Sequence, residues 1–337
     1  MSQSKSGIQN SDIQELAGLN FLFDIQSSPD NIIDWAESNA SKIDEILHQN
    51  GALLIRGLKI QGSKKLEKVL TAAFGEELLE YIYRSTPRTK MRGRVYTSSE
   101  YHADESILLH NENAYSNRWP LRIAFYCVKA AAMGGATPIA DSRSVYQNIP
   151  VEIRQEFERR KLLYVRNYSE LDLPWIEVFQ TNDKQKVEQY CQQNGVEFEW
   201  LPENKLRTKQ MNDATSIHPF TQQKVWFNQA HLFHISSQSD EIRKSLLNIV
   251  GLDGLPRNVY YGDGGEIDEQ TIAIIRQAYE ENTVIFDWQE GDLLLLDNML
   301  FAHGRKPFKG SRRILTGMSR SVDFQINKIK KMEEEVN

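Results

Sequence analysis

Three residues in this sequence have the types and spacing of a mononuclear iron site. His110 and Glu112 are separated by one residue in the strand-like segment SILLHNENAY, and side chains at positions i and i+2 of a strand point to the same side. His303 follows a long apolar segment near the C-terminal end, where a distant strand could supply a third ligand. Two imidazoles and one carboxylate on one face of a metal leave positions open for a cosubstrate and oxygen, which is the ligand set of non-haem iron oxygenases.

The same residue types occur at two other places. His102 and Asp104 repeat the His-x-carboxylate spacing, and His231 and His234 are spaced as on one face of a helix. A His-x-carboxylate pair occurs by chance in many proteins, so the residues alone leave His102 and Asp104 open as ligands. We interpret His231 and His234 as structural or pocket-lining side chains, because the sequence shows no third ligand for them.

An oxygenase of this type also has to hold the far carboxylate of 2-oxoglutarate. A guanidinium group does this best, because its planar fork pairs with both carboxylate oxygens. Arg312 and Arg313 follow His303 on the next expected strand, and strand parity allows only one of them to face the site. Thr137, after the glycine pair at 134–135, is a candidate hydroxyl donor on a neighbouring strand.

The elements that must position these residues are mostly strands. The strand-like segments are RGRVYTSS, SILLHNENAY, LRIAFYCVKAA, TPIADSR, GDLLLLDNMLFAHG and RRILTGMSRSVDF. Amphipathic helical spacing at 31–49 predicts N-terminal helices, and helical patterns return in the middle of the chain. We expect a mainly β protein with flanking helices. Its parts are a flexible N-terminus (1–12), a single domain (13–325) with an insertion at about 143–215, and a C-terminal tail (326–337).

Bulk composition limits the function further. The chain has 337 residues and a net charge of −6, which argues against binding to a nucleic-acid backbone. No run of 18 apolar residues and no secretory signal is found, so no membrane partner is expected. The two cysteines, Cys127 and Cys191, are too few for a disulfide framework. We expect a reduced, cytoplasmic protein.

Motifs spread over most of the chain resemble those of the taurine dioxygenase / clavaminate synthase-like (TauD/TfdA) family. The resemblance is greatest to the branch that includes the syringomycin-pathway aspartyl hydroxylase. It extends in one order over roughly residues 15–325. The matching pieces are GALLIRG, HNENAY, WPLRIAFYC, GGATPIADSR, HP at 218–219, VWFNQAHLFH, YGDG and GDLLLLDNMLFAHGRKPFKGSRRI.

This resemblance implies a double-stranded β-helix (jelly-roll) core with N-terminal helices and a helical insertion. It also implies that His110, Glu112 and His303 bind the metal. The family's 2-oxoglutarate threonine matches Thr137, and its 2-oxoglutarate arginine, the second of an RRI-like triplet, matches Arg313. The implied cofactors are Fe(II), 2-oxoglutarate as cosubstrate and O2.

Three details of the resemblance narrow the prediction. The family places its threonine at a fixed distance after the ligand pair, which fits His110 and not His102. Taurine dioxygenase carries a second arginine four residues after the first, where this chain has Gly317, so a sulfonate substrate is disfavoured. Related halogenases lack the carboxylate ligand, and Glu112 therefore argues against halogenation.

The resemblance implies hydroxylation of an unactivated C–H bond in a polar small molecule. We expect an amino acid, free or tethered to a carrier protein, in a biosynthetic pathway, with Asn113 as a substrate contact. A desaturase, epoxidase or cyclase would use the same iron site. A non-catalytic jelly-roll binding protein and a zinc-dependent hydrolase are the alternatives of other classes.

Overall fold

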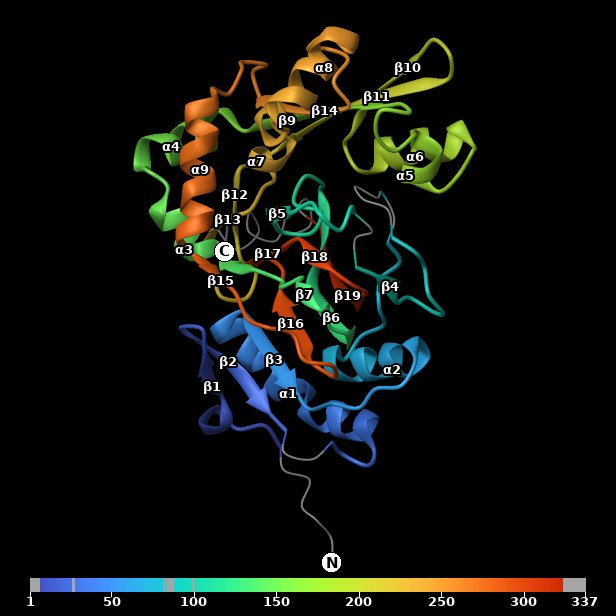
Figure 1. The fold of residues 1–337 in the computed structure, drawn as a ribbon. Coiled ribbons are helices and arrows are strands. Elements are labelled where there is room, and N and C mark those ends of the chain that lie inside the picture. Colours follow the sequence, from blue (N-terminus) through green and yellow to red (C-terminus); the bar gives the residue numbers. More distant parts are fainter. Residues whose placement is uncertain (1–6, 26–27, 82, 84–87, 99–100, 324–337) are drawn as a thin grey trace, which may run out of the picture.

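The core of the protein consists of two β-sheets that pack face to face (Figure 1). The structure is a computed structural model that describes residues 7–25, 28–81, 83, 88–98 and 101–323. One sheet has seven strands, in the order β1 (Gln14–Leu16), β2 (Leu19–Asp24), β3 (Ala52–Arg56), β16 (Leu293–Asp297), β6 (Arg118–Lys129), β19 (Arg313–Asp323) and β4 (Tyr96–Thr97). The other has the order β15 (Thr283–Val284), β8 (Ile139–Asp141), β17 (Phe301–Arg305) and β5 (Ile107–His110). The predicted mainly β, jelly-roll fold is confirmed.

The central strands of the larger sheet are buried on both faces. In β16, Leu294 and Leu296 pack between the two sheets, while Leu293 and Leu295 pack against the N-terminal helices. Burial on both sides explains why this strand is a continuous apolar run and does not alternate with polar residues.

The N-terminal helices α1 (Ile32–Asn50) and α2 (Ser63–Phe74) cover the outer face of the larger sheet (Figure 1). The side chain of Asn31 caps the start of α1, and Gly51 ends the helix in the left-handed conformation at φ 78°. A Cβ at Gly51 would lie 2.5 Å from the ring of Phe301. Glycine is therefore required both by the backbone and by the close approach of β17.

A large insertion separates β8 from β15 and spans residues 142–282. It contains a separate four-stranded sheet in the order β10, β11, β9, β14. Its elements are α3 (Ser142–Asn148), α4 (Val151–Arg160), β9 (Leu162–Tyr168), α5 (Trp175–Phe179), α6 (Lys184–Gln193), β10 (Glu197–Leu201), β11 (Lys205–Asn212), β12 (Thr215–Ile217), β13 (Lys224–Trp226), α7 (Ala230–Phe233), α8 (Asp240–Val250), β14 (Arg257–Tyr261) and α9 (Glu269–Glu281).

The insertion is longer than the predicted 143–215. Phe157 from its first half and Trp226 and Ile275 from its second half belong to one buried cluster. The later elements therefore complete the same hydrophobic core and cannot be divided from the earlier ones.

Part of the N-terminal segment packs against α1. Ile8 is only 1% exposed, and its backbone N–H donates to the side-chain oxygen of Asn39 at 2.7 Å. Flexibility over 1–12 stays a prediction. Residues 1–6 and the predicted tail at 326–337 lie outside the described residues.

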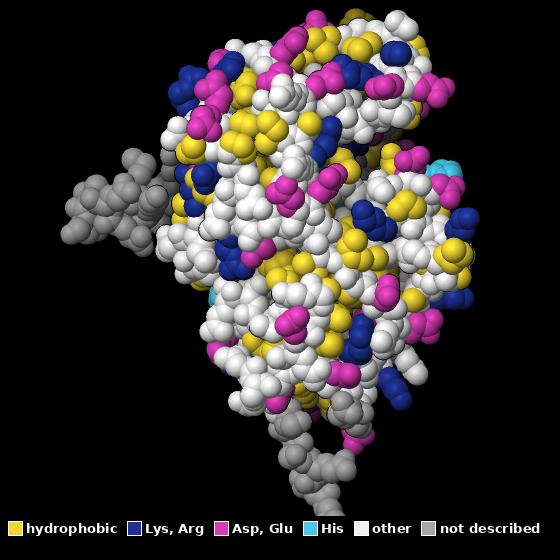
Figure 2. Space-filling view, turned by 60° about the vertical axis from the view of Figure 1, so that its left-hand side comes forward, with side chains coloured by type: hydrophobic (Ala, Val, Ile, Leu, Met, Phe, Trp, Pro, Cys, Tyr) yellow, Lys and Arg dark blue, Asp and Glu magenta, His cyan; other side chains and the backbone are white. Residues whose placement is uncertain are grey.

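Charged side chains of both signs are interspersed on the face of the molecule drawn in Figure 2. That face has no continuous basic surface, in agreement with the negative net charge of the sequence. None of the helices in the described part of the chain has the length and apolar character needed to cross a bilayer.

Candidate metal centre

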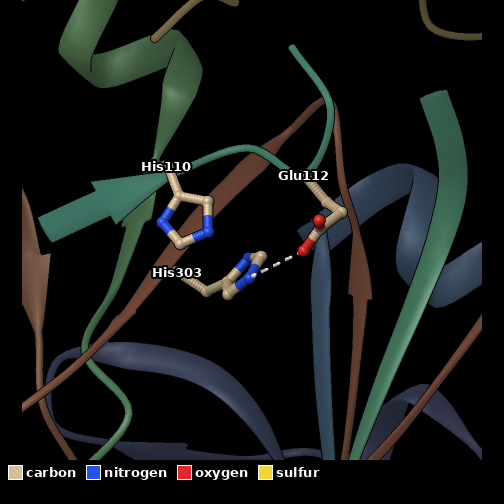
Figure 3. A group of neighbouring side chains, drawn as sticks. All are labelled: His110, Glu112 and His303. Carbon is tan, nitrogen blue, oxygen red and sulfur yellow. Dashed lines mark ion pairs between the residues drawn. The ribbon is translucent and has the colours of Figure 1, made fainter. Parts of the chain in front are cut away.

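The three predicted ligands converge at one end of the smaller sheet (Figure 3). His110 on β5 and His303 on β17 are register partners on adjacent antiparallel strands. The ligand atoms of His110, Glu112 and His303 all lie within 4.8 Å of one another, and Nε2 of His303 is 3.9 Å from Oε2 of Glu112. Such spacing allows one ion to contact all three side chains.

Glu112 reaches this position by a different route from the one predicted. Strand β5 ends at His110, so Glu112 lies in the turn that follows and does not share a strand with its partner. The next residue, Asn113, has φ 57°. The i, i+2 rule for strands is therefore the wrong reason for the convergence, and the backbone of the turn aims the carboxylate.

Both imidazoles are prepared for metal binding. Nδ1–H of His110 donates to the carbonyl of Leu108 at 2.8 Å, which leaves Nε2 with its lone pair free for a metal. Nδ1 of His303 is buried and has no hydrogen-bond partner among the described residues. Burial lowers the pKa of His110, and that of His303 to well below its usual value, so both rings stay neutral as ligands. This donor set fits Fe(II).

Arg88, which the sequence analysis missed, is a neighbour of the candidate metal ligands. Its Nη2 lies 2.6 Å from Oε2 of Glu112, and the two side chains are each 2% exposed. The guanidinium also lies over the ring of Tyr81, 4.6 Å from its centroid. Arg88 follows no recognisable motif in the sequence, so no pattern could have identified it.

A small pocket opens beside the two histidines. Its lining residues are Arg88, Ser98, Ile107, His110, Phe125, Thr137, His303, Gly304, Arg305 and Arg312. Phe125 covers one side of His303, with the ring centroids 4.9 Å apart. The pocket thus joins the candidate ligands to the predicted 2-oxoglutarate residue Thr137.

Arg312, and not Arg313, lies beside Thr137. Nη2 of Arg312 donates to Oγ1 of Thr137 at 3.3 Å, and its Nε donates to the carbonyl of Gly135 at 2.8 Å. Trp288 donates to the same hydroxyl from Nε1 at 3.0 Å. Burial lowers the pKa of Arg312 to about 10, so the group remains charged at neutral pH. Arg313 is exposed and outside the pocket lining.

Strand parity explains this correction. Ile314 and Met318 on β19 point into the cluster between the sheets, and Leu315 points to the cluster under the N-terminal helices. Arg312 shares the parity of Ile314, and Arg313 shares that of Leu315. Because both faces of β19 are buried, the sequence showed no alternation from which the inner face could be recognised.

The same parity changes the interpretation of Gly317. A Cβ at Gly317 would lie 2.7 Å from the side chain of Leu70 on α2, so this position faces the helices and not the pocket. The residue four positions after Arg312 is Thr316, which is fully buried. The argument against a sulfonate substrate therefore used the wrong position, Gly317. Thr316, the position that corresponds to Arg312, is not an arginine either.

The predicted substrate contact Asn113 is not among the residues that line the pocket. Its side-chain oxygen accepts a hydrogen bond from the hydroxyl of Tyr115 at 3.4 Å. Its assignment as a substrate contact stays a prediction without support from the pocket lining.

The competing histidines form no second metal site among the described residues. His102 and Asp104 lie 3.9 Å apart, with side chains 80% and 78% exposed, and no third ligand joins them. His234 bonds with the carbonyl of Ile267. His231 contacts the carbonyl of Leu109 at 2.7 Å, so one member of this pair lies next to the candidate metal ligand His110.

A family model matches most of the chain. The model of the taurine catabolism dioxygenase TauD, TfdA family covers residues 15–319. Among characterised relatives, the chain is 44% identical over 273 residues to the dapdiamide synthesis protein DdaC of Enterobacter agglomerans, covering 81% of this chain and 83% of the relative. It is 32% identical over 289 residues to a clavaminate synthase-like protein of Arabidopsis thaliana, covering 82% of this chain and 83% of the relative.

Solved structures share the fold at low sequence identity. PvcB from Pseudomonas aeruginosa aligns with a TM-score of 0.53 and 14% identity over 94% of this chain and 92% of its own. AAD-2, solved with Mn(II) and N-oxalylglycine, aligns with a TM-score of 0.53 and 13% identity over 90% of this chain and 94% of its own. The family match and the relatives lead to one conclusion: the chain belongs to the taurine catabolism dioxygenase TauD, TfdA family and is an iron(II)- and 2-oxoglutarate-dependent dioxygenase.

Proposed function

We propose that His110, Glu112 and His303 hold Fe(II), and that Arg312 and Thr137 bind the far carboxylate of 2-oxoglutarate. The enzyme then hydroxylates an unactivated C–H bond of an amino acid that carries a free carboxylate. The observation that carries this proposal is that the pocket is lined by His110, His303 and the Arg312–Thr137 pair, with Glu112 grouped with the two histidines.

With Fe(II) bound, the site would activate O2, which is the oxidant: one oxygen atom would enter succinate as 2-oxoglutarate loses carbon dioxide, and the other would enter the substrate C–H bond. The side chains of this protein provide orientation and a protected environment. Arg312 and Thr137 fix the orientation of the cosubstrate through charge-assisted and neutral hydrogen bonds. Phe125 lies against His303 and would limit the access of water to this ring.

The charges around the pocket support an anionic substrate. Arg88, Arg305 and Arg312 line it, and Glu112 is the carboxylate that lies beside Arg88. The charges of Fe(II) and 2-oxoglutarate offset each other, so the described lining side chains keep an excess of positive charge after both have bound. A substrate carboxylate beside these arginines would offset that excess.

This charge balance also separates the two forms of substrate. An amino acid attached to a carrier protein through its α-carboxyl group has lost that charge, whereas the free amino acid retains it. We therefore favour a free amino acid, or a tethered one with a second carboxylate. The similarity to a dapdiamide synthesis protein supports a role in a biosynthetic pathway.

Succinate release tests the proposal when it is measured across matched pairs of compounds. Each amino acid is offered with its free carboxylate and as its carboxamide. The carboxamide group is similar in size to the carboxylate but is uncharged. We expect succinate above the substrate-free level only with carboxylate members, and a product heavier by one oxygen atom. Turnover with both members of a pair would contradict the charge argument. A product lighter by two hydrogen atoms would identify a desaturase.

A further inference from the structure

The backbone that carries His110 and Glu112 leaves the sheet before it reaches Glu112. Strand β5 lies at the edge of the smaller sheet and, among the described residues, pairs with β17 alone. Beyond His110 the chain forms a turn in which the N–H of Ala114 donates to the carbonyl of Asn111 at 3.3 Å, while the backbone of Glu112 pairs with no described strand. Buried backbone groups need partners, and here side chains from two other parts of the fold provide them.

Two of these side chains come from the start of α7 in the insertion. Nε2–H of His231 donates to the carbonyl of Leu109 at 2.7 Å, and Nε2 of Gln229 donates to the carbonyl of Asn111 at 2.7 Å. Leu109 and Asn111 are the residues immediately before and after His110. Gln229 and His231 are each 2% exposed, so water does not compete for these bonds.

The third side chain comes from the turn between β16 and β17. Asn298 accepts a hydrogen bond from the N–H of Glu112 at 2.7 Å, and its amide donates to the carbonyl of Glu112 at 3.0 Å. The same amide donates to the carbonyl of Pro120 at 2.8 Å, and Asn298 is fully buried. A single side chain thus replaces both bonds that a neighbouring strand would make to Glu112. It also ties Glu112 to the turn that leads to His303.

We propose that Asn298, Gln229 and His231 form a side-chain clamp that positions His110 and Glu112 for the metal. They are positioning residues, because they contact the ligand-bearing backbone and not the ion. The inference rests on the proposed function, in that it takes His110 and Glu112 to be metal ligands. It adds that the insertion is required for the geometry of the metal site.

Metal binding without cosubstrate gives the test, with Mn(II) as the ion because it does not oxidise in air. Outer partners of metal ligands change affinity by about 10- to 100-fold when they are removed. We expect Asn298→Ala to raise the Kd for Mn(II) at least about tenfold. Gln229→Met removes one bond and keeps the volume of the side chain, and it should raise the Kd in the same direction.

Asn228 offers a matched control. It is fully buried and bonds to Ala214 and Ala230, but it contacts neither Glu112 nor the residues beside His110. We expect Asn228→Ala to lower the Tm of the metal-free protein while it leaves the Mn(II) affinity of the folded protein unchanged. The absorption spectrum of bound Co(II), which reports ligand geometry, should change in Asn298→Ala and not in Asn228→Ala.

The outcomes separate the two hypotheses. Wild-type Mn(II) affinity in folded Asn298→Ala and Gln229→Met would overturn the clamp while the iron site stands. An absence of Mn(II) binding by the wild-type protein would instead overturn the proposed function. If Asn298→Ala does not fold, Gln229→Met and Asn228→Ala still give the comparison, because Gln229→Met preserves packing.

Discussion

His110 and His303 face each other across two adjacent antiparallel strands, with their ring centroids 4.6 Å apart. This pairing brings together residues separated by most of the length of the chain, and the turn after β5 adds Glu112 to the same point. Two buried, neutral imidazoles and a buried carboxylate at this spacing form a ligand set that one divalent ion could bind. The arrangement is therefore best explained as a metal site.

Replacement of His303 by alanine should abolish succinate formation, because two remaining ligands cannot hold Fe(II) in the required geometry. His234→Ala provides the control, since this buried histidine bonds with the carbonyl of Ile267 away from the metal ligands. Activity should survive in His234→Ala to the extent that the protein stays folded. Metal-dependent turnover in His303→Ala would rule out its role as a ligand.

Arg312→Ala and Arg313→Ala form a matched pair of adjacent substitutions. Loss of a hydrogen bond to a charged group costs about 1.5–3 kcal/mol, so Arg312→Ala should raise the KM for 2-oxoglutarate about 10- to 100-fold. Arg313 is exposed, and Arg313→Ala should leave that KM close to the wild-type value. The KM is obtained from initial rates at varied 2-oxoglutarate concentration. A raised KM in Arg313→Ala together with a wild-type KM in Arg312→Ala would support the original prediction for Arg313.

Arg88→Met should make the protein unusually dependent on metal for its stability. Removal of Arg88 leaves the buried carboxylate of Glu112 without its partner, which destabilises the metal-free protein by about 3 kcal/mol. A bound cation replaces the lost charge. Thermal unfolding should therefore show a larger rise in Tm with Mn(II) in Arg88→Met than in the wild-type protein.

Arg143→Met is the control for this measurement, because Arg143 pairs with Asp141 outside the metal pocket. It should lower the Tm without enlarging the effect of Mn(II). Equal Mn(II) effects in both variants and in the wild-type protein would show that Arg88 does not balance a ligand charge.

The pH dependence of metal binding follows from the lowered pKa values of His110 and His303. Only the neutral ring binds a metal, and a histidine with its pKa lowered below 6.5 is more than half neutral at pH 6.5. Two ordinary histidines would be half protonated there, which would weaken binding about fourfold. We expect the Kd for Mn(II) to rise by less than about fourfold from pH 8 to pH 6.5 and to rise further below that range. A fourfold weakening by pH 6.5 would contradict the assignment of buried, neutral ligands.

The sequence was sufficient to predict the fold class and to select three side chains that the structure brings together, because both leave local patterns. His110 and Glu112 stand one residue apart, and His303 follows the apolar run of β16. The reason given for the first pair was nevertheless wrong, because a strand that ends at His110 looks the same in sequence as one that continues to Glu112.

Other parts of the site depend on long-range contacts that no local pattern records. Arg88 pairs with Glu112 from an irregular segment, and Asn298 reaches Glu112 from a turn that is distant in sequence. The choice between Arg312 and Arg313 depended on which face of β19 points toward the pocket. The sequence did not show this, because β19 is buried on both sides. In each case the deciding information was the packing of one element against another.

Crystals of the protein grown with Mn(II) provide the most direct test of the metal site, through the anomalous scattering of the bound ion. We predict one peak bonded to an imidazole nitrogen of His110, an imidazole nitrogen of His303 and a carboxylate oxygen of Glu112. A peak coordinated by other side chains, or none at these three residues under saturating Mn(II), would contradict the assignment.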